Sequence, residues 1–72
     1  MSRQELYKQG YFFLRKRHTT SRARLWSIAK EWSLYISEEF GKWNLVEKFD
    51  TEEEVDWEIE QYVANYPNCI VE

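Results

Sequence analysis

Two short stretches of alternating apolar and polar residues constrain the fold of this chain more than any other feature. Residues 32–37 and 43–49 show the two-residue period of β-strands, and a loop with Gly41 separates them. An antiparallel hairpin has to place the apolar residues of both strands on one face. The register that does so pairs Ile36 with Trp43, Leu34 with Leu45, and Trp32 with Glu47. Its apolar face carries Trp32, Leu34, Ile36, Trp43, Leu45 and Phe49, and its other face carries Ser33, Tyr35, Asn44, Val46 and Lys48.

Part of the same region also fits the period of a helix. A helix over residues 22–40 would begin after Ser21 and end at Gly41, with one apolar face. Its first turn would be basic and its last turn acidic, which is the unfavourable arrangement for the helix dipole. We therefore predict strands at 32–37 and 43–49, and a further strand near residues 24–29. The helical alternative would give a mostly α or a β-α-β-α domain.

The clearest local signal is the start of a C-terminal helix. Asp50 or Thr51 can cap it, and the glutamates at 52–54 interact favourably with the helix dipole. A strand over the same residues would place like charges side by side. Pro67 ends the helix, and residues 68–72 form a short tail that lies against the sheet or frays. The residues that the helix is predicted to bury are Val55, Ile59, Tyr62, Val63 and Tyr66.

The N-terminal residues predict a short helix and a further strand. Ser2 and Glu5 match a capping box, so a helix over residues 3–9 is expected to end at Gly10. Residues 11–17 suit a strand with Phe12 and Leu14 facing the core, and residues 18–21 suit a loop. Together the elements predict one α+β domain over residues 1–72. It is a small antiparallel sheet of three to four strands with one C-terminal amphipathic helix packed on its apolar face.

Charge is distributed unevenly along the chain. Residues 1–30 hold eight Lys and Arg and one acid, whereas residues 31–72 hold two bases and twelve acids, and the net charge is −3. In a domain this small the two halves must touch, so part of the charge is expected to pair internally. Exposed pairs contribute only about 0 to 1 kcal/mol each. The asymmetry therefore bears more on partners than on stability.

No known constellation of catalytic or ligand-binding residues is found in the sequence. The chain has a single cysteine, Cys69, and a single histidine, His18, without a nucleophile elbow. Gly10 and Gly41 stand alone, and the acids at 52–60 lack the pattern of a calcium loop. We expect no enzyme activity, no cofactor or metal, and no small-molecule substrate. With no long apolar run, we expect a cytoplasmic protein without a membrane partner.

The excess of aromatic residues and the absence of catalytic groups favour a small non-enzymatic interaction module. It would associate with itself, as a homodimer, or dock on a protein partner, and its acidic C-terminal helix would act as a regulator or inhibitor. Trp57 lies off the apolar stripe of that helix, where a tryptophan commonly anchors an interface. The residues expected to meet the partner are Asp56, Trp57 and Glu60.

The alternative is a nucleic-acid-binding accessory protein that uses the basic aromatic segment 11–24. Exposed rings on a strand can stack on unpaired bases while neighbouring arginines contact phosphates. A strand end that is solvated or paired with acids explains the same residues without a ligand. The residues expected to contact nucleic acid are Tyr11, Arg15, Arg17, Arg22 and Arg24.

Overall fold

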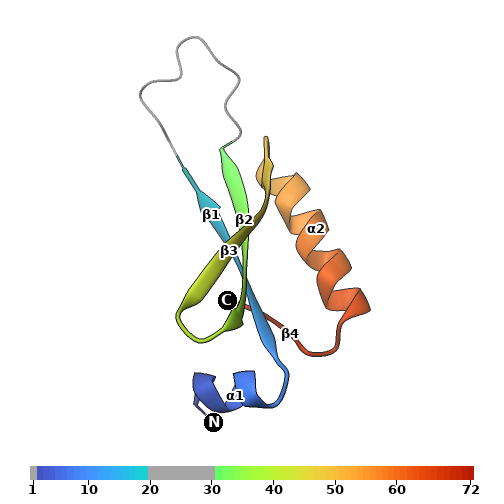
Figure 1. Cartoon of the computed structure of the whole chain (residues 1–72). Helices are drawn as coiled ribbons and strands as arrows, with labels where there is room; N and C mark the ends of the chain where they lie inside the picture. The colour runs from blue at the N-terminus through green and yellow to red at the C-terminus, as the bar shows by residue number, and fades with distance from the viewer. Residues whose placement is uncertain (1, 20–30) are drawn as a thin grey trace.

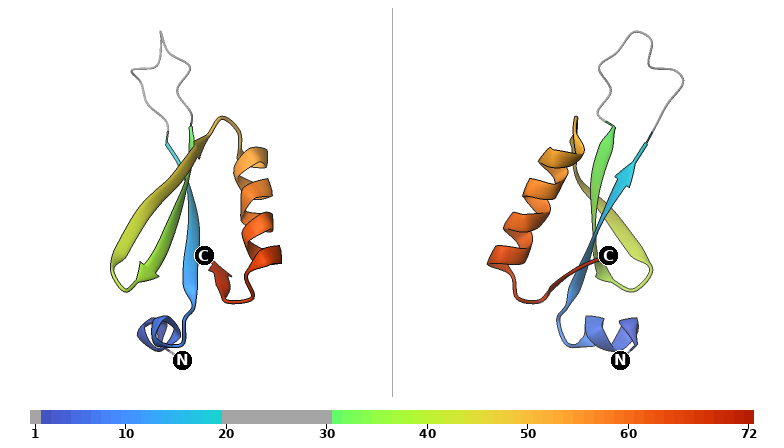
Figure 2. Two further views of the ribbon diagram at one scale, coloured as in Figure 1. Left: turned by 45° about the vertical axis from the view of Figure 1, so that its right-hand side comes forward. Right: turned by 180° about the vertical axis from the view of Figure 1, so that it is seen from behind.

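The computed structural model describes residues 2–19 and 31–72, which form a four-stranded sheet and two helices (Figure 1). The sheet has the strand order β3-β2-β1-β4, in which β1 is antiparallel to β2, β2 is antiparallel to β3, and β1 is parallel to β4. Figure 2 shows α2 lying along one face of the sheet. The predicted α+β fold is therefore confirmed. The elements are α1 (Arg3–Lys8), β1 (Phe12–His18), β2 (Trp32–Glu39), β3 (Lys42–Phe49), α2 (Glu52–Asn65) and β4 (Cys69–Val71).

The short helix α1 forms where the capping residues predict it. The Ser2 hydroxyl accepts a hydrogen bond from the backbone N–H of Glu5 at 3.3 Å, and the helix ends before Gly10, whose φ is 93°. Its Tyr7 ring packs edge-on against Phe13 with 5.0 Å between centroids, and the Tyr7 hydroxyl donates to that of Ser37. The helix thereby covers one end of the sheet face opposite α2.

The hairpin of β2 and β3 exists, but its predicted register is wrong. The connection is the two-residue turn Phe40–Gly41 rather than the longer loop that pairing Ile36 with Trp43 implies, and Gly41 has a φ of 81°. Leu34 pairs with Glu47 while the next residue, Tyr35, pairs with Leu45. The intervening Val46 is an extra residue on β3, a β-bulge. The observed pairs that replace the predicted ones are Trp32–Phe49, Leu34–Glu47, Tyr35–Leu45 and Ile36–Asn44.

The bulge moves two residues out of the predicted apolar face. Trp32, Leu34, Ile36 and Phe49 pack beneath α2 as expected, whereas Trp43 and Leu45 lie on the opposite face, where Leu45 is 49% exposed. Phe12 and Leu14 of β1 face the core, as predicted, and fill the space that Trp43 and Leu45 were expected to occupy. The core beneath the helix consists of Leu14, Leu34, Phe49, Val55 and Ile59, with Phe12, Trp32, Ile36, Tyr62 and Cys69 packed against it.

The helix α2 begins at the predicted cap and buries less than predicted. Thr51 Oγ1 accepts from the Glu54 N–H at 3.2 Å, and Val55 and Ile59 are buried. Val63 and Tyr66 are about half exposed, at 50% and 49%. Because each four-residue step advances the side chain by about 40° around the axis, a stripe that starts at Val55 has turned away from the sheet two steps later.

The C-terminal tail forms a strand, one of the two outcomes that the sequence left open. Cys69 pairs with Phe12 and Val71 with Leu14, and the Asn68 side-chain amide donates to the Gly10 carbonyl at 2.7 Å. His18, predicted in a loop, is the last residue of β1. Strand β2 excludes the helical alternative over residues 32–39. The predicted strand near 24–29, Arg22 and Arg24 lie outside the described residues.

Candidate interaction surfaces

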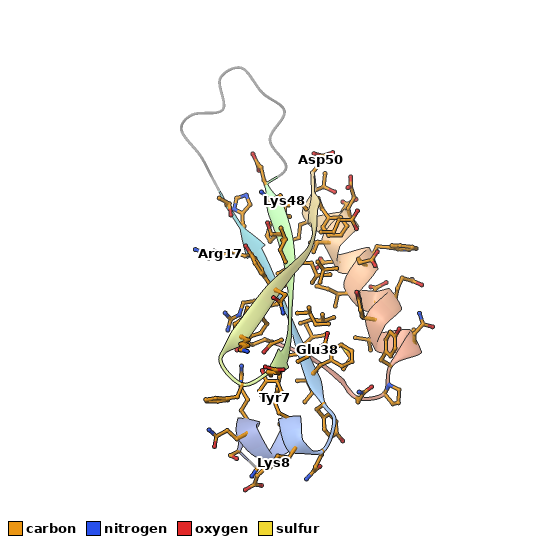
Figure 3. The ribbon with its side chains drawn as sticks, viewed as in Figure 1. Tyr7, Lys8, Arg17, Glu38, Lys48 and Asp50 are labelled. Carbon is orange, nitrogen blue, oxygen red and sulfur yellow. The ribbon has the colours of Figure 1, made fainter. Side chains whose placement is uncertain are left out.

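The sheet separates two surfaces of different composition. The surface that faces away from α2 is called the open face. It is defined by alternate residues of three strands, and Figure 3 shows one of them, Arg17, on the side of the sheet away from α2. The second surface lies where the end of β3 meets the start of α2, and is called the acidic groove. The open face comprises Phe13, Arg15, Arg17, Ser33, Tyr35, Ser37, Trp43, Leu45 and Lys48, and Lys48 also lines the acidic groove.

On the open face, guanidinium groups stack on aromatic rings. The Arg15 guanidinium carbon lies 4.2 Å from the ring centroid of Trp43, and that of Arg3 lies 4.5 Å from the centroid of Phe13. The carboxylate of Glu72 joins the two, at 2.7 Å from Arg15 and 2.9 Å from Arg3. The two cations are thus held in fixed positions over the sheet.

The charges around Glu72 change its acidity. Partial burial alone would raise the pKa of this carboxyl, but the hydrogen bonds from Arg3 and Arg15, together with their charges, outweigh burial. The pKa of Glu72 is therefore lowered from its ordinary value. The carboxylate stays ionised at neutral pH and occupies part of the donor capacity of both arginines.

The residues predicted to contact nucleic acid are only partly brought together. Arg15 and Arg17 share the open face, and within residues 2–19 and 31–72 Arg17 has no ion-pair partner. Tyr11 precedes β1, is half-buried, and donates its backbone N–H to the Leu6 carbonyl at 3.0 Å. The sequence predicted Trp43 on the apolar face beneath the helix, because the bulge that brings it beside Arg15 leaves no mark in the alternating pattern.

On the covered side of the sheet, the one basic residue of β1 is paired internally. The Lys16 ammonium lies 2.6 Å from an oxygen of Asp56 and 2.9 Å from one of Glu52. The hydrogen bond from Asp56 and then that from Glu52 raise the pKa of Lys16. The expected internal pairing of the two halves is confirmed here and at Glu72. Asp56, predicted to meet a partner, forms an ion pair that joins α2 to the sheet, and its side chain remains partly exposed.

The acidic groove contains the most exposed tryptophan of the described residues. Trp57, which lies off the apolar stripe, is 59% exposed and lies in a shallow groove of about 750 Å³. The i, i+3, i+4 spacing of Glu54, Trp57 and Glu58 on α2 is the sequence signal for this group. Glu60 is exposed but does not line the groove. The groove is lined by Glu47, Lys48, Phe49, Thr51, Glu53, Glu54, Trp57 and Glu58.

The two residues with nucleophilic or acid–base potential are far apart. Cys69 pairs with Phe12 at the start of β1, whereas His18 is six residues further along that strand, a span of about 20 Å. The His18 ring stacks on Trp32 with 4.6 Å between centroids, and its Nε2 lies 3.2 Å from Glu31. Burial raises the pKa of the Cys69 thiol, which disfavours the reactive thiolate.

Other classes of site were also sought. Within the described ranges, no three His, Cys, Asp or Glu side chains are grouped so that they would hold a metal ion. No helix in those ranges combines the length and the apolar character needed to span a bilayer. Comparison with known protein families, curated proteins and solved structures finds no match. The two surfaces are therefore the candidate functional sites.

Proposed function

We propose that this protein is a small non-enzymatic interaction module that docks a basic segment of a protein partner in its acidic groove. The observation that carries the proposal is the exposure of Trp57, 59%, among glutamates. A large indole left in water is an apolar surface that a partner can bury, and tryptophan is enriched among the residues that dominate binding energy.

The composition of the groove supports a basic partner. Four of its eight lining residues are glutamates, and Lys48 is the one base among them. A lysine or arginine of the partner can lay its aliphatic stem or guanidinium on the Trp57 ring while its charge meets Glu54 or Glu58. An acidic segment would be repelled at the same place. The occupant is therefore a basic segment, and binding is expected to weaken as salt rises.

The neighbouring edge of the sheet supports the same proposal. Among the described strands, β3 is an edge strand that pairs only with β2, and its last residues line the groove. An extended segment of a partner can add backbone hydrogen bonds along such an edge while one side chain enters the groove. The bulge at Val46 interrupts this edge, which limits indiscriminate strand pairing between copies of the chain.

The test is the binding of a fluorescent nine-residue peptide of alternating arginine and glycine, measured by anisotropy at low salt. Trp57→Ala is expected to weaken binding about 30-fold, the size of effect typical of an interface anchor. Glu58→Gln is expected to weaken it several-fold. The matched control is Glu60→Gln, which makes the same charge change on the same helix outside the groove, and it should alter Kd less than twofold.

Three outcomes would overturn the proposal. They are the absence of peptide binding, an equal effect of Glu60→Gln and Glu58→Gln, and equal binding of a peptide with glutamate in place of arginine. Sedimentation of the free protein identifies the competing occupant. A concentration-dependent dimer that Trp57→Ala abolishes would show that a second copy fills the groove instead.

A further inference from the structure

The open face is a second surface, and its chemistry differs from that of the acidic groove. Helix α1 covers only the end at Phe13, and within the described part of the chain no other element lies over the centre. Tyr35 and Trp43 are half-buried there, and Arg15 and Arg17 are exposed. In the strand ladder Tyr35 pairs with Arg15 on one side and with Leu45 on the other. Arg15 therefore lies beside Tyr35 in the ladder, and its guanidinium group stacks on the ring of Trp43.

The arrangement of charge favours an anion on this face. Arg15, Arg17 and Lys48 project from the strands on this face, with Arg3 beside them, while Glu72 pairs with Arg3 and Arg15, and Glu39 pairs with Lys42 at the hairpin tip. The acids of α2 lie on the far side of the sheet, where Lys16 compensates only two of them. An approaching polyanion is thus attracted to one face of the molecule and repelled from the other.

The rings decide between two kinds of anionic partner. An acidic protein segment would use the arginines but would gain little from flat aromatic surfaces. Unpaired bases stack on such rings, a contribution that is tolerant of sequence. Arg15 and Arg17 are two residues apart on one strand, so their side chains leave the sheet about 7 Å apart and can contact successive phosphates of one strand.

We propose that the open face binds single-stranded nucleic acid, with Trp43 and Tyr35 stacking on bases and Arg15 and Arg17 contacting phosphates. Glu72 is a built-in competitor, because its carboxylate takes hydrogen bonds from Arg3 and Arg15 that a phosphate would otherwise accept. None of the four residues proposed to contact nucleic acid lines the acidic groove, so either proposal can fail without the other.

The experiment measures the anisotropy of labelled twelve-nucleotide oligo(dT) and oligo(U), at about 50 and 200 mM salt. Wild-type protein is expected to bind both oligonucleotides more tightly at the lower salt. Arg15→Ala with Arg17→Ala should abolish most binding. Trp43→Ala should weaken it about tenfold through lost stacking, and circular dichroism checks that this variant is folded.

The most discriminating comparison uses two variants of equal charge. Glu72→Gln frees the arginines and should tighten binding several-fold, whereas Glu60→Gln raises the net charge equally on α2 and should change Kd less than twofold at 100 mM salt, where charges beyond about 10 Å are screened. Equal tightening by both variants would overturn the proposal. So would failure to bind at low salt, binding unaffected by Arg17→Ala, or equally strong competition by an acidic peptide.

Discussion

The two faces of the sheet are built from the same strands and differ in how deeply their apolar side chains are buried. On the face covered by α2, Leu14 and Leu34 are completely buried, and the one cation, Lys16, is tied to two carboxylates. On the open face Leu45 is 49% exposed and Arg17 projects from β1 without an ion-pair partner among the described residues. Stability is thus concentrated on one face, and the other has surface available for a partner.

The largest effect is expected from shortening a leucine on the covered face, and the same change on the open face is the comparison. Leu34→Ala leaves a cavity in the core and should lower the free energy of unfolding by about 2 to 5 kcal/mol. Leu45→Ala removes a half-exposed side chain and should cost less than about 1 kcal/mol. Urea denaturation followed by circular dichroism measures both values. Similar losses at the two positions would show that the open face is covered in solution.

The helix on the covered face should contribute more to global stability than the helix on the open face. Thr51→Ala removes the cap of α2, which supplies Val55 and Ile59 to the core, and should cost about 1 kcal/mol. Ser2→Ala frays the six-residue α1 and should cost a few tenths of a kcal/mol in global stability, while hydrogen exchange in residues 3–8 increases. An equal global loss from both variants would mean that α1 is as important to the core as α2.

Lys16→Met measures how much the cation of the covered face contributes to stability, separately from the arginines of the open face. Asp56 and Glu52 raise the pKa of Lys16, so the charged form stabilises the fold below its unfolded pKa, and this contribution is lost as pH rises through the higher folded pKa. At pH 7 the substitution should cost about 0 to 1 kcal/mol because the pair is partly solvated. The difference from wild type should shrink above the ordinary lysine pKa. A constant difference across that range would contradict the pairing.

The smallest effect is expected at the ion pairs near the open face, and it has the opposite pH dependence. The pKa of Glu72 is lowered, so its carboxylate stabilises the fold above the unfolded pKa, and this contribution is lost as pH falls through the folded pKa. Glu72→Gln should therefore be less stable than wild type near pH 6 and almost equal to it near pH 2. Thermal unfolding at the two pH values measures the difference, and a larger gap at low pH would refute the assignment.

Local chemistry predicted the elements of the fold better than it predicted their pairing. Ser2 and Thr51 cap helices where the sequence indicates, because capping depends on a few neighbouring residues. The register of the hairpin was wrong because Trp43 and Leu45 are apolar and fit either face, and only backbone geometry places the bulge. The pairing of β4 with β1 joins residues from opposite ends of the chain, which no local pattern reports.

Some features of the candidate residues follow from helical or strand periodicity. Arg15 and Arg17 share one face, as the two-residue period of a strand requires. Trp57 lies off the apolar stripe of α2 and is exposed. The ion pair of Asp56 was missed because its partner, Lys16, lies forty positions earlier and reaches it only through the packing of α2 on the sheet. The stacking of Arg15 on Trp43 depends in the same way on the shifted register.

Because Val46 is an extra residue in β3, the face that the side chains at the hairpin tip occupy depends more on the number of residues in this strand than on their identity. Deleting Val46 would remove this bulge and still leave Leu45 opposite Tyr35, so the exposed and buried faces would be preserved. Adding one residue between Val46 and Phe49 would instead force the hairpin tip to reverse its faces or to form a wider bulge. An insertion at this point, more than the deletion of Val46 or a point substitution, is therefore the genetic change that can turn Trp43 inward.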